Sequence, residues 1–242
     1  LFNRTSKSVC LRQEGIHSPP DAELILNTAL SAKERLGQHE QFIPFELGCH
    51  NRMEINLLPP ILKKLTEFFP LLRPVIQIVP FPSLLSQVEN KQVHAAFGIK
   101  EEQKKSSLYF RELCSAPMAC ICSPGHPLAQ FDSLTKDQLS GSIIACSPRQ
   151  IADPIFSIQN SIVAKLRPEQ RYFSENMESA LTLVKAQIGY TLYPDVIPAR
   201  EPDLAYIPVT DIPKMSFGVY YRYDDDHPVL RRFLMLCREL GT

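Results

Sequence analysis

The spacing of apolar residues predicts strands and helices that alternate from residue 43 onward. Ile43, Phe45 and Leu47 recur at every second position, which is typical of a strand. Residues 53–69 carry apolar side chains every three or four positions and are followed by proline, which predicts one helix. The continuous apolar run 75–79 predicts a buried strand.

The same alternation continues to the end of the chain. Helices are predicted at 83–90, 152–166, 176–187 and 229–240, and strands at 95–99, 118–122, 142–146, 171–173, 190–193, 204–207 and 217–223. Strands that alternate with helices indicate βαβ units and a mainly parallel sheet. We therefore expect an α/β fold of two Rossmann-like subdomains, with the chain crossing between them near 113–117 and returning near 213–217.

A separate helix is predicted near the beginning of the chain. Ser18 is a typical N-cap, prolines follow it, and Gly37 is a typical stop. Apolar residues recur between these ends at alternating spacings of three and four: Ala22, Ile25, Ala29, Ala32 and Leu36. Such a seam favours helix pairing between two protomers, and the alternative is a helix packed on its own domain.

The glycines exclude several common enzyme motifs. The chain has 9 glycines and 21 prolines, and no two glycines lie closer than eleven positions. The Rossmann fingerprint, the P-loop and the nucleophile elbow all need glycines closer together than that. Because the sequence also shows no activated nucleophile, we expect no enzyme activity and no cofactor.

The charges balance overall but not locally. Lysine and arginine number 26, as do aspartate and glutamate, so net charge gives no argument for nucleic-acid binding. Residues 1–13, however, contain Arg4, Lys7 and Arg12 and no acidic residue. This basic patch suits a phosphate backbone, and an ordinary solvated surface is the alternative.

Seven cysteines form an odd number in a chain of 242 residues, which favours reduced thiols and a cytoplasmic protein over a disulfide framework. Cys120, Cys122 and His126 lack a second pair of ligands, so no metal site is expected. The longest uncharged stretch, 113–131, is interrupted by prolines and predicts no membrane span.

Two parts of the sequence together resemble the LysR-type transcriptional regulators. Leu1-Phe2-Asn3-Arg4, Val9-Cys10-Leu11 and Gly15 are similar to the end of the family's winged helix-turn-helix. Residues 42–240 resemble its effector-binding domain, and the matching pieces are Leu58-Pro59, Phe69-Pro70, Glu89 to Phe97, His126-Pro127-Leu128 and Val184, Gly189 and Pro194 in this order. The order and spacing of these pieces carry the resemblance over nearly the whole chain.

The resemblance implies a DNA-binding regulator that assembles as a homodimer or homotetramer. It implies a remnant of the wing at 1–15, a linker helix at 16–41, effector-binding subdomain I at 42–115 and 217–242, and subdomain II at 116–216, in a type 2 periplasmic-binding-protein fold. The DNA-reading helix would precede Leu1, so we expect a piece of a longer chain. Arg4 and Lys7 would contact the DNA backbone. Arg12 and Pro19-Pro20 depart from the usual start of the linker helix.

The candidate effector site lies where strands end. In open α/β sheets, ligands bind beyond the carboxyl ends of strands, and helix N-termini at that edge favour anions. The residues at these positions are Cys49, His50, Asn51, Phe81, Ile99, Lys100, Ser147, Arg149, Gln150 and Asn176. Family effectors are often small carboxylates, which Arg149 or Lys100 could pair with.

Each candidate has an ordinary structural alternative. His50 and Arg149 could be surface residues, Asn176 a plain helix cap, and Lys100 part of a solvated charged loop. Two other functions also stay open. A solute-binding protein would share the fold, and a thiol-based redox sensor would use Cys49, because a helix N-terminus lowers the pKa of a thiol.

Overall fold

The computed structural model describes residues 2–4, 9–11, 26, 28, 29, 42–101 and 107–239. Its chain divides into two units, Leu1–Ile43 and Pro44–Thr242. In the first unit, β1 (Phe2–Arg4) pairs antiparallel with β2 (Val9–Leu11). Ala29 is helical and exposed. The rest of the predicted seam and one predicted DNA contact lie outside the described residues: Lys7, Ala22, Ile25, Ala32 and Leu36.

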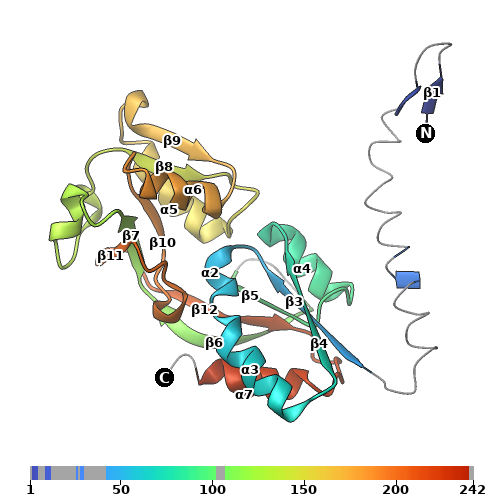
Figure 1. The fold of residues 1–242 in the computed structure, drawn as a ribbon. Coiled ribbons are helices and arrows are strands. Elements are labelled where there is room, and N and C mark those ends of the chain that lie inside the picture. The colour runs from blue at the N-terminus through green and yellow to red at the C-terminus, as the bar shows by residue number, and fades with distance from the viewer. Residues whose placement is uncertain are drawn as a thin grey trace. The chain divides into compact units, whose positions relative to one another are not determined.

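Lobe I, as we call it, is built on a five-stranded sheet in the order β4-β3-β5-β12-β6. The strands are β3 (Ile43–Cys49), β4 (Leu72–Ile78), β5 (Ala95–Ile99), β6 (Tyr109–Ala116) and β12 (Met215–Tyr221). The helices are α2 (Arg52–Ile55), α3 (Leu58–Phe68), α4 (Phe81–Glu89) and α7 (Leu230–Arg238). Helices α3 and α7 pack against each other beside the sheet (Figure 1). Phe45, Phe97 and Phe233 form contacting rings in its core.

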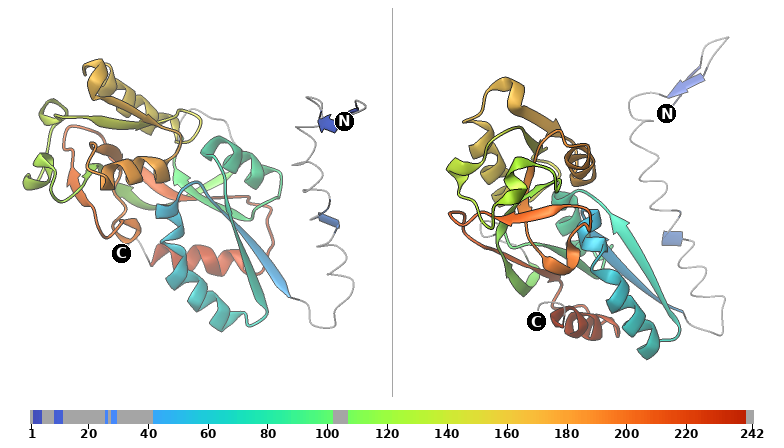
Figure 2. Two further views of the ribbon diagram at one scale, coloured as in Figure 1. Left: turned by 45° about the horizontal axis from the view of Figure 1, so that its top comes forward. Right: turned by 60° about the vertical axis from the view of Figure 1, so that its left-hand side comes forward.

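Lobe II contains the remaining sheets of the second unit. One has the order β10-β7-β11, from β7 (Met118–Cys122), β10 (Thr191–Pro194) and β11 (Ala205–Pro208). The other pairs β8 (Ile143–Cys146) in parallel with β9 (Arg171–Ser174). Helices α5 (Asp153–Val163) and α6 (Met177–Lys185) both pack against β8. The chain passes from lobe I to lobe II at Pro117 and returns between Pro208 and Met215 (Figure 2).

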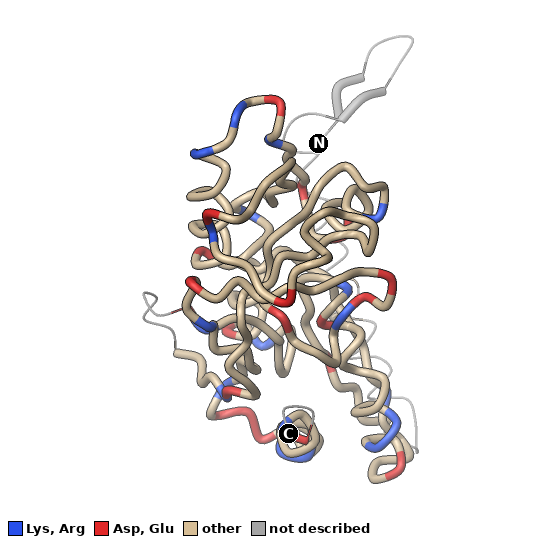
Figure 3. The backbone as a smooth tube through the Cα atoms, turned by 90° about the vertical axis from the view of Figure 1, so that its left-hand side faces the viewer, with Lys and Arg blue, Asp and Glu red and all other residues tan. Residues whose placement is uncertain are grey.

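Four short 3-10 helices complete lobe II: η1 (Pro127–Gln130), η2 (Lys136–Gln138), η3 (Pro168–Gln170) and η4 (Ile197–Ala199). Acidic and basic positions are interspersed over the second unit, in agreement with the balanced charge of the sequence (Figure 3). Among the described residues, no helix is long and apolar enough to cross a membrane.

Three expectations about the elements are wrong in detail. The sheets are not mainly parallel. The five-stranded sheet is mixed, because β12 pairs antiparallel with both β5 and β6 while β3 pairs parallel with β5, and the β10-β7-β11 sheet is antiparallel. The single helix expected at 53–69 is divided into α2 and α3 by a turn at Asn56 and Leu57. The run 75–79 is not buried: β4 is an edge strand, and its Val75, Ile76 and Ile78 are exposed.

Candidate functional site

The end of β3 places three candidate residues at the boundary with lobe II. Cys49 is the last residue of the strand, His50 follows it, and Asn51 is the N-cap of α2. The Asn51 side chain accepts a hydrogen bond from the backbone N–H of Glu54 at 3.0 Å, as a capping asparagine does. Because this cap fixes the turn after β3, the His50 and Asn51 side chains both have defined positions, and both are buried.

A buried polar network joins the two lobes at this point. Asn51 Nδ2 donates a hydrogen bond to the Tyr193 hydroxyl at 2.8 Å, and the same hydroxyl lies 2.8 Å from His50 Nε2. Tyr193 belongs to β10 of lobe II and is 6% exposed. Burial, followed by the charge of Glu54, raises the pKa of its hydroxyl well above the ordinary value, so the group keeps its proton.

The carboxylate of Glu54 contacts His50 on the side of Nδ1. His50 Nδ1 lies 2.7 Å from Glu54 Oε1, and the backbone N–H of His50 donates to Glu54 Oε2 at 2.8 Å. His50 Nδ1 and Glu54 Oε1 are both buried and form no hydrogen bond of regular geometry, so this pair is a close polar contact. Tyr193 of lobe II therefore contacts the His50 side chain, and the backbone N–H of His50 bonds to Glu54.

The structure corrects the expectation that Cys49 is a reactive, redox-sensing thiol. Its thiol is fully buried, and burial together with the nearby carboxylate of Glu54 raises its pKa above the ordinary value. The helix that follows it, α2, has only four residues. A thiol with a raised pKa is poorly ionised and so a weak nucleophile, which is the opposite of the lowered pKa expected from the sequence.

Hydrogen bonds beside the network also cross between the lobes. The backbone N–H of Arg52 donates to Glu178 Oε1 of α6 at 2.6 Å. Glu201, which is buried, accepts from Lys185 at 2.8 Å and from Asn56 of lobe I at 3.4 Å. The Lys185 ammonium lowers the pKa of Glu201, so this carboxylate stays ionised where the lobes meet.

The space directly at the network is too small for an effector. A cavity lined by Asn51, Ile99, Tyr193 and Phe217 has a volume of about 10 Å³. That is the size of roughly one water molecule. A small-molecule effector needs a larger space than this one.

A cavity of about 520 Å³ lies nearby and has walls from both lobes. Lobe I contributes Ile99, Lys100 and Glu101. Lobe II contributes one face of α5, and the segment returning to lobe I forms the rest; these residues are Asp153, Pro154, Ser157, Ile158 and Pro213–Ser216. The volume falls within the range of roughly 300–1,000 Å³ that is typical of ligand pockets.

The ten candidate residues fall into separate groups. Cys49, His50 and Asn51 gather at the network, where the Phe81 ring lies 5.3 Å from the His50 ring. Ile99 borders both cavities, whereas Lys100 lines only the larger one.

The other four candidates lie in lobe II. Ser147 lines a third cavity, and Gln150 closes a turn by donating its backbone N–H to the Ser147 carbonyl. Arg149 is exposed in that turn and lines none of these three cavities. Asn176 caps α6 by accepting from Ser179 N–H at 2.8 Å, which is the role of an ordinary helix cap.

Three residues of the site were missed by the sequence reasoning. Glu54 stands four positions after His50, a spacing that would have pointed to a pair on one helical turn. Tyr193 is 142 positions from Asn51 and had no local signal. Lys214 lies in the segment returning to lobe I, where no pattern in the sequence indicates a binding residue.

Metal and disulfide chemistry find no support in the described part of the chain. No group of three or more His, Cys, Asp or Glu side chains is arranged there to hold a metal ion. The cysteines whose side chains the structure describes, at 49, 114, 120, 122, 146 and 237, are free thiols.

Comparison with known sequences identifies relatives over the whole chain. A model of the LysR substrate binding domain matches residues 44–242. The HTH-type transcriptional regulator IlvR of Caulobacter vibrioides is 24% identical over 251 residues, which cover 100% of this chain and 83% of IlvR. YbhD of Escherichia coli, an uncharacterized HTH-type transcriptional regulator, is 22% identical and is covered to 78%.

Solved structures of LysR regulators share the fold. CbnR, a LysR family transcriptional regulator, superposes with a TM-score of 0.70 at 15% identity, covering 96% of this chain and 82% of CbnR. The effector binding domain of BenM, solved with its effector benzoate, has a TM-score of 0.62 at 18% identity and covers 81% of this chain and 91% of its own. The type 2 periplasmic-binding-protein fold and the resemblance seen in residues 42–240 are thus confirmed. The chain belongs to the LysR family of transcriptional regulators, and residues 44–242 match the family's effector-binding domain.

Proposed function

We propose that this regulator senses a small carboxylate in the cavity of about 520 Å³ between its lobes. The observation that carries the proposal is that both lobes form the walls of this cavity. A ligand that touches both lobes binds one lobe arrangement better than another, and only such a difference can shift a conformational equilibrium. The shift would then change how protomers are arranged on DNA.

The chemistry of the cavity supports an anionic effector. Lys100 and Lys214 stand on two of its walls, and Asp153 and Pro154 of the wall belong to the first turn of α5. Lysine ammonium groups and helix N-termini both favour a carboxylate. Glu101 and Asp153 also line the space and repel an anion. The carboxylate is therefore expected closer to Lys100 and Lys214 than to these two acidic residues.

A thermal-shift screen against small carboxylates, each paired with its neutral amide, tests this proposal. A carboxylate at 100 times its dissociation constant should stabilise the protein by about 2.7 kcal/mol, and its amide should not. Lys100→Ala and Lys214→Ala should each reduce the shift. Lys63→Ala is the matched control, because Lys63 is exposed on α3 and outside the cavity.

Two results would contradict the proposal. An amide that shifts the melting temperature as much as its acid would exclude recognition of the carboxylate. A carboxylate whose effect survives both cavity variants unchanged would show that the effector binds elsewhere.

A further inference from the structure

A groove on lobe II, between α5 and the edge strand β9, is separate from the cavity between the lobes. It has a volume of about 370 Å³. Most of its lining residues are apolar; the lining residues are Ala145, Cys146, Ser147, Pro148, Phe156, Asn160, Val163, Phe173 and Ser174. None of these residues lines the larger cavity. We propose that this groove is a second small-molecule site, for an aromatic ring that carries an anionic group.

Hydrogen bonds hold α5 against β8 and β10, and the groove lies on another side of this helix, next to β9. Gln159 is fully buried, its Oε1 accepts from Cys146 N–H at 2.8 Å, and its Nε2 donates to the Leu192 carbonyl at 2.8 Å. These two bonds attach the middle of α5 to both β8 and β10. Because α5 cannot move toward β9 without losing them, the space beside Phe156 and Phe173 stays unfilled.

The floor of the groove is uncharged. Cys146 is 2% exposed, and burial raises the pKa of its thiol to about 11. Its sulfur lies 3.6 Å from Ser174 Oγ and 3.8 Å from Met177 Sδ, so the polar atoms at the floor contact one another rather than the groove. A neutral thiol behaves as a small apolar group, which suits an aromatic ring rather than an ion.

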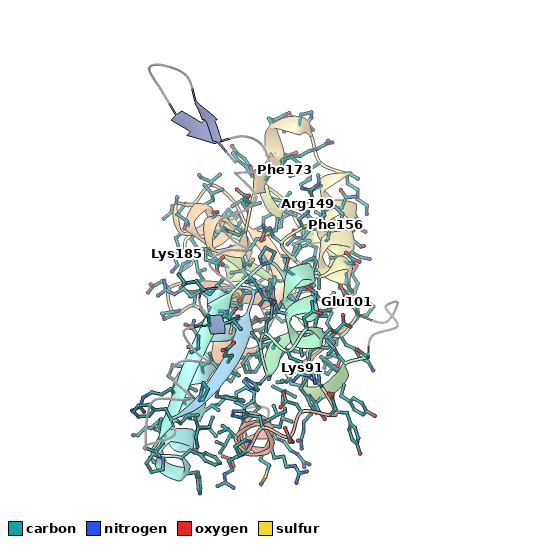
Figure 4. The ribbon with its side chains drawn as sticks, turned by 90° about the vertical axis from the view of Figure 1, so that its right-hand side faces the viewer. Lys91, Glu101, Arg149, Phe156, Phe173 and Lys185 are labelled. Carbon is teal, nitrogen blue, oxygen red and sulfur yellow. The ribbon has the colours of Figure 1, made fainter. Side chains whose placement is uncertain are left out.

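Two phenyl rings stand on opposite walls of the groove. Phe156 projects from α5 and is half-buried, whereas Phe173 of β9 is 70% exposed (Figure 4). A ring that enters between them removes apolar surface of Phe173 from water and gains ring contacts. The groove is small for a protein segment but matches the size range of ligand pockets, roughly 300–1,000 Å³.

The charge at the mouth of the groove indicates the anionic group. Arg149 directly follows Pro148, a lining residue, in the turn closed by Gln150. Its side chain is exposed, and none of the ion pairs found among the described residues includes it. A guanidinium at that place can pair with a carboxylate or sulfonate attached to the bound ring.

The dye 8-anilinonaphthalene-1-sulfonate, an aromatic anion, provides a direct probe of this groove. Its fluorescence should increase on saturable binding to the whole chain. Phe173→Ala should weaken binding by about tenfold, because one wall is lost. Asn160→Trp should abolish it by filling the groove, and Asn160 is exposed on α5, so the helix tolerates the change. Arg149→Ala should weaken binding less and reduce its dependence on salt.

Two controls separate this site from other surfaces. Tyr223→Ala removes an aromatic side chain that is 77% exposed on lobe I and should leave dye binding unchanged. Lys63→Ala removes an exposed lysine of α3 that lines neither space and should also have no effect. Loss of dye binding in Lys100→Ala would instead place the dye in the cavity between the lobes and overturn the groove as its site, so failure of this proposal and of the effector proposal can be told apart. Unchanged affinity in both Phe173→Ala and Asn160→Trp, with native circular dichroism, would overturn the groove as the site. Equal affinity for 2-naphthoate and 2-naphthamide in competition with the dye would overturn the anionic group.

Discussion

Tyr190 and Tyr193 lie three positions apart, and both are buried, but their hydroxyls have opposite surroundings. The Tyr193 hydroxyl bonds to Asn51 and contacts His50 across the lobe boundary. The Tyr190 hydroxyl has no hydrogen-bond partner among the described residues. Since a satisfied buried hydroxyl stabilises and an unsatisfied one costs free energy, the same substitution should act differently at the two positions.

Tyr193→Phe should lower the free energy of unfolding by about 1–2 kcal/mol, because Asn51 and His50 each lose a partner. Tyr190→Phe should leave it unchanged or raise it. Urea denaturation of both variants and the wild-type chain measures the difference. An equal loss in the two variants would mean that the inter-lobe network does not contribute to stability.

The sequence predicted part of this network, for a local reason. His50 and Asn51 follow a clear strand and precede a helix, so their place at a strand end was visible. The partner hydroxyl was not, because no local pattern connects residues 142 positions apart. The spacing of four positions between His50 and Glu54 is the one local signal for this third residue.

At the scale of elements, the approach of β8 to β10 depends on a missing side chain. Tyr190 N–H donates to the Ser142 carbonyl at 3.0 Å, and Ile144 N–H donates to the Tyr190 carbonyl at 2.8 Å. A Cβ atom on Gly189 would overlap the same Ser142 carbonyl, whereas a Cβ on Gly125 would have nothing within 4 Å. The same substitution at Gly189 and at Gly125 therefore compares a crowded position with an open one.

Gly189→Ala should destabilise the protein by about 1–3 kcal/mol, because the backbone of one strand must shift away from the other. Gly125→Ala should change stability by no more than about 0.5 kcal/mol. Thermal unfolding of the two variants would show the contrast. Similar melting temperatures would mean that the two strands separate at no cost.

The spacing of apolar residues predicted where most helices and strands lie along the chain better than it predicted whether they are buried. The run 75–79 has the composition of a buried strand, yet β4 is at the edge of the sheet. Nothing within that run distinguishes a central strand from an edge strand, since sheet order depends on the rest of the chain. Strand β6 escaped notice because polar and apolar residues are mixed in Tyr109–Ala116 without a clear alternation.

At the scale of the whole molecule, α/β alternation was enough to predict two lobes in one fold and a return of the chain to the first lobe near 213–217. It did not predict that β12 pairs antiparallel with both β5 and β6 in the first sheet. That return brings the C-terminal segment to the beginning of β3. His227 lies there against His94, with ring centroids 4.2 Å apart, and its Nε2 lies 2.9 Å from the Pro44 carbonyl. Burial, followed by the neighbouring His227, lowers the pKa of His94, and burial also lowers the pKa of His227.

This histidine pair should make the fold sensitive to acid. A histidine whose pKa is lower in the folded state is protonated first in the unfolded chain, so stability is fully present above the unfolded value of about 6.5 and is lost as pH falls below it. The free energy of unfolding should therefore decrease between about pH 7.5 and about pH 5. His94→Gln and His227→Gln should each flatten that decrease, as urea titrations would measure. An equally steep decrease in both variants would assign the effect to other groups.

Helix α5 separates two spaces with one short stretch of sequence. Asp153, Pro154, Ser157 and Ile158 line the cavity between the lobes, and Phe156, Asn160 and Val163 line the groove beside β9. Ile155, Gln159 and Ile162 are buried between them. Nearly every residue of α5 therefore faces the cavity between the lobes, faces the groove, or is buried in the core. In evolutionary terms the two spaces are not free to diverge independently, because an insertion or a one-residue shift in α5 would alter both at once.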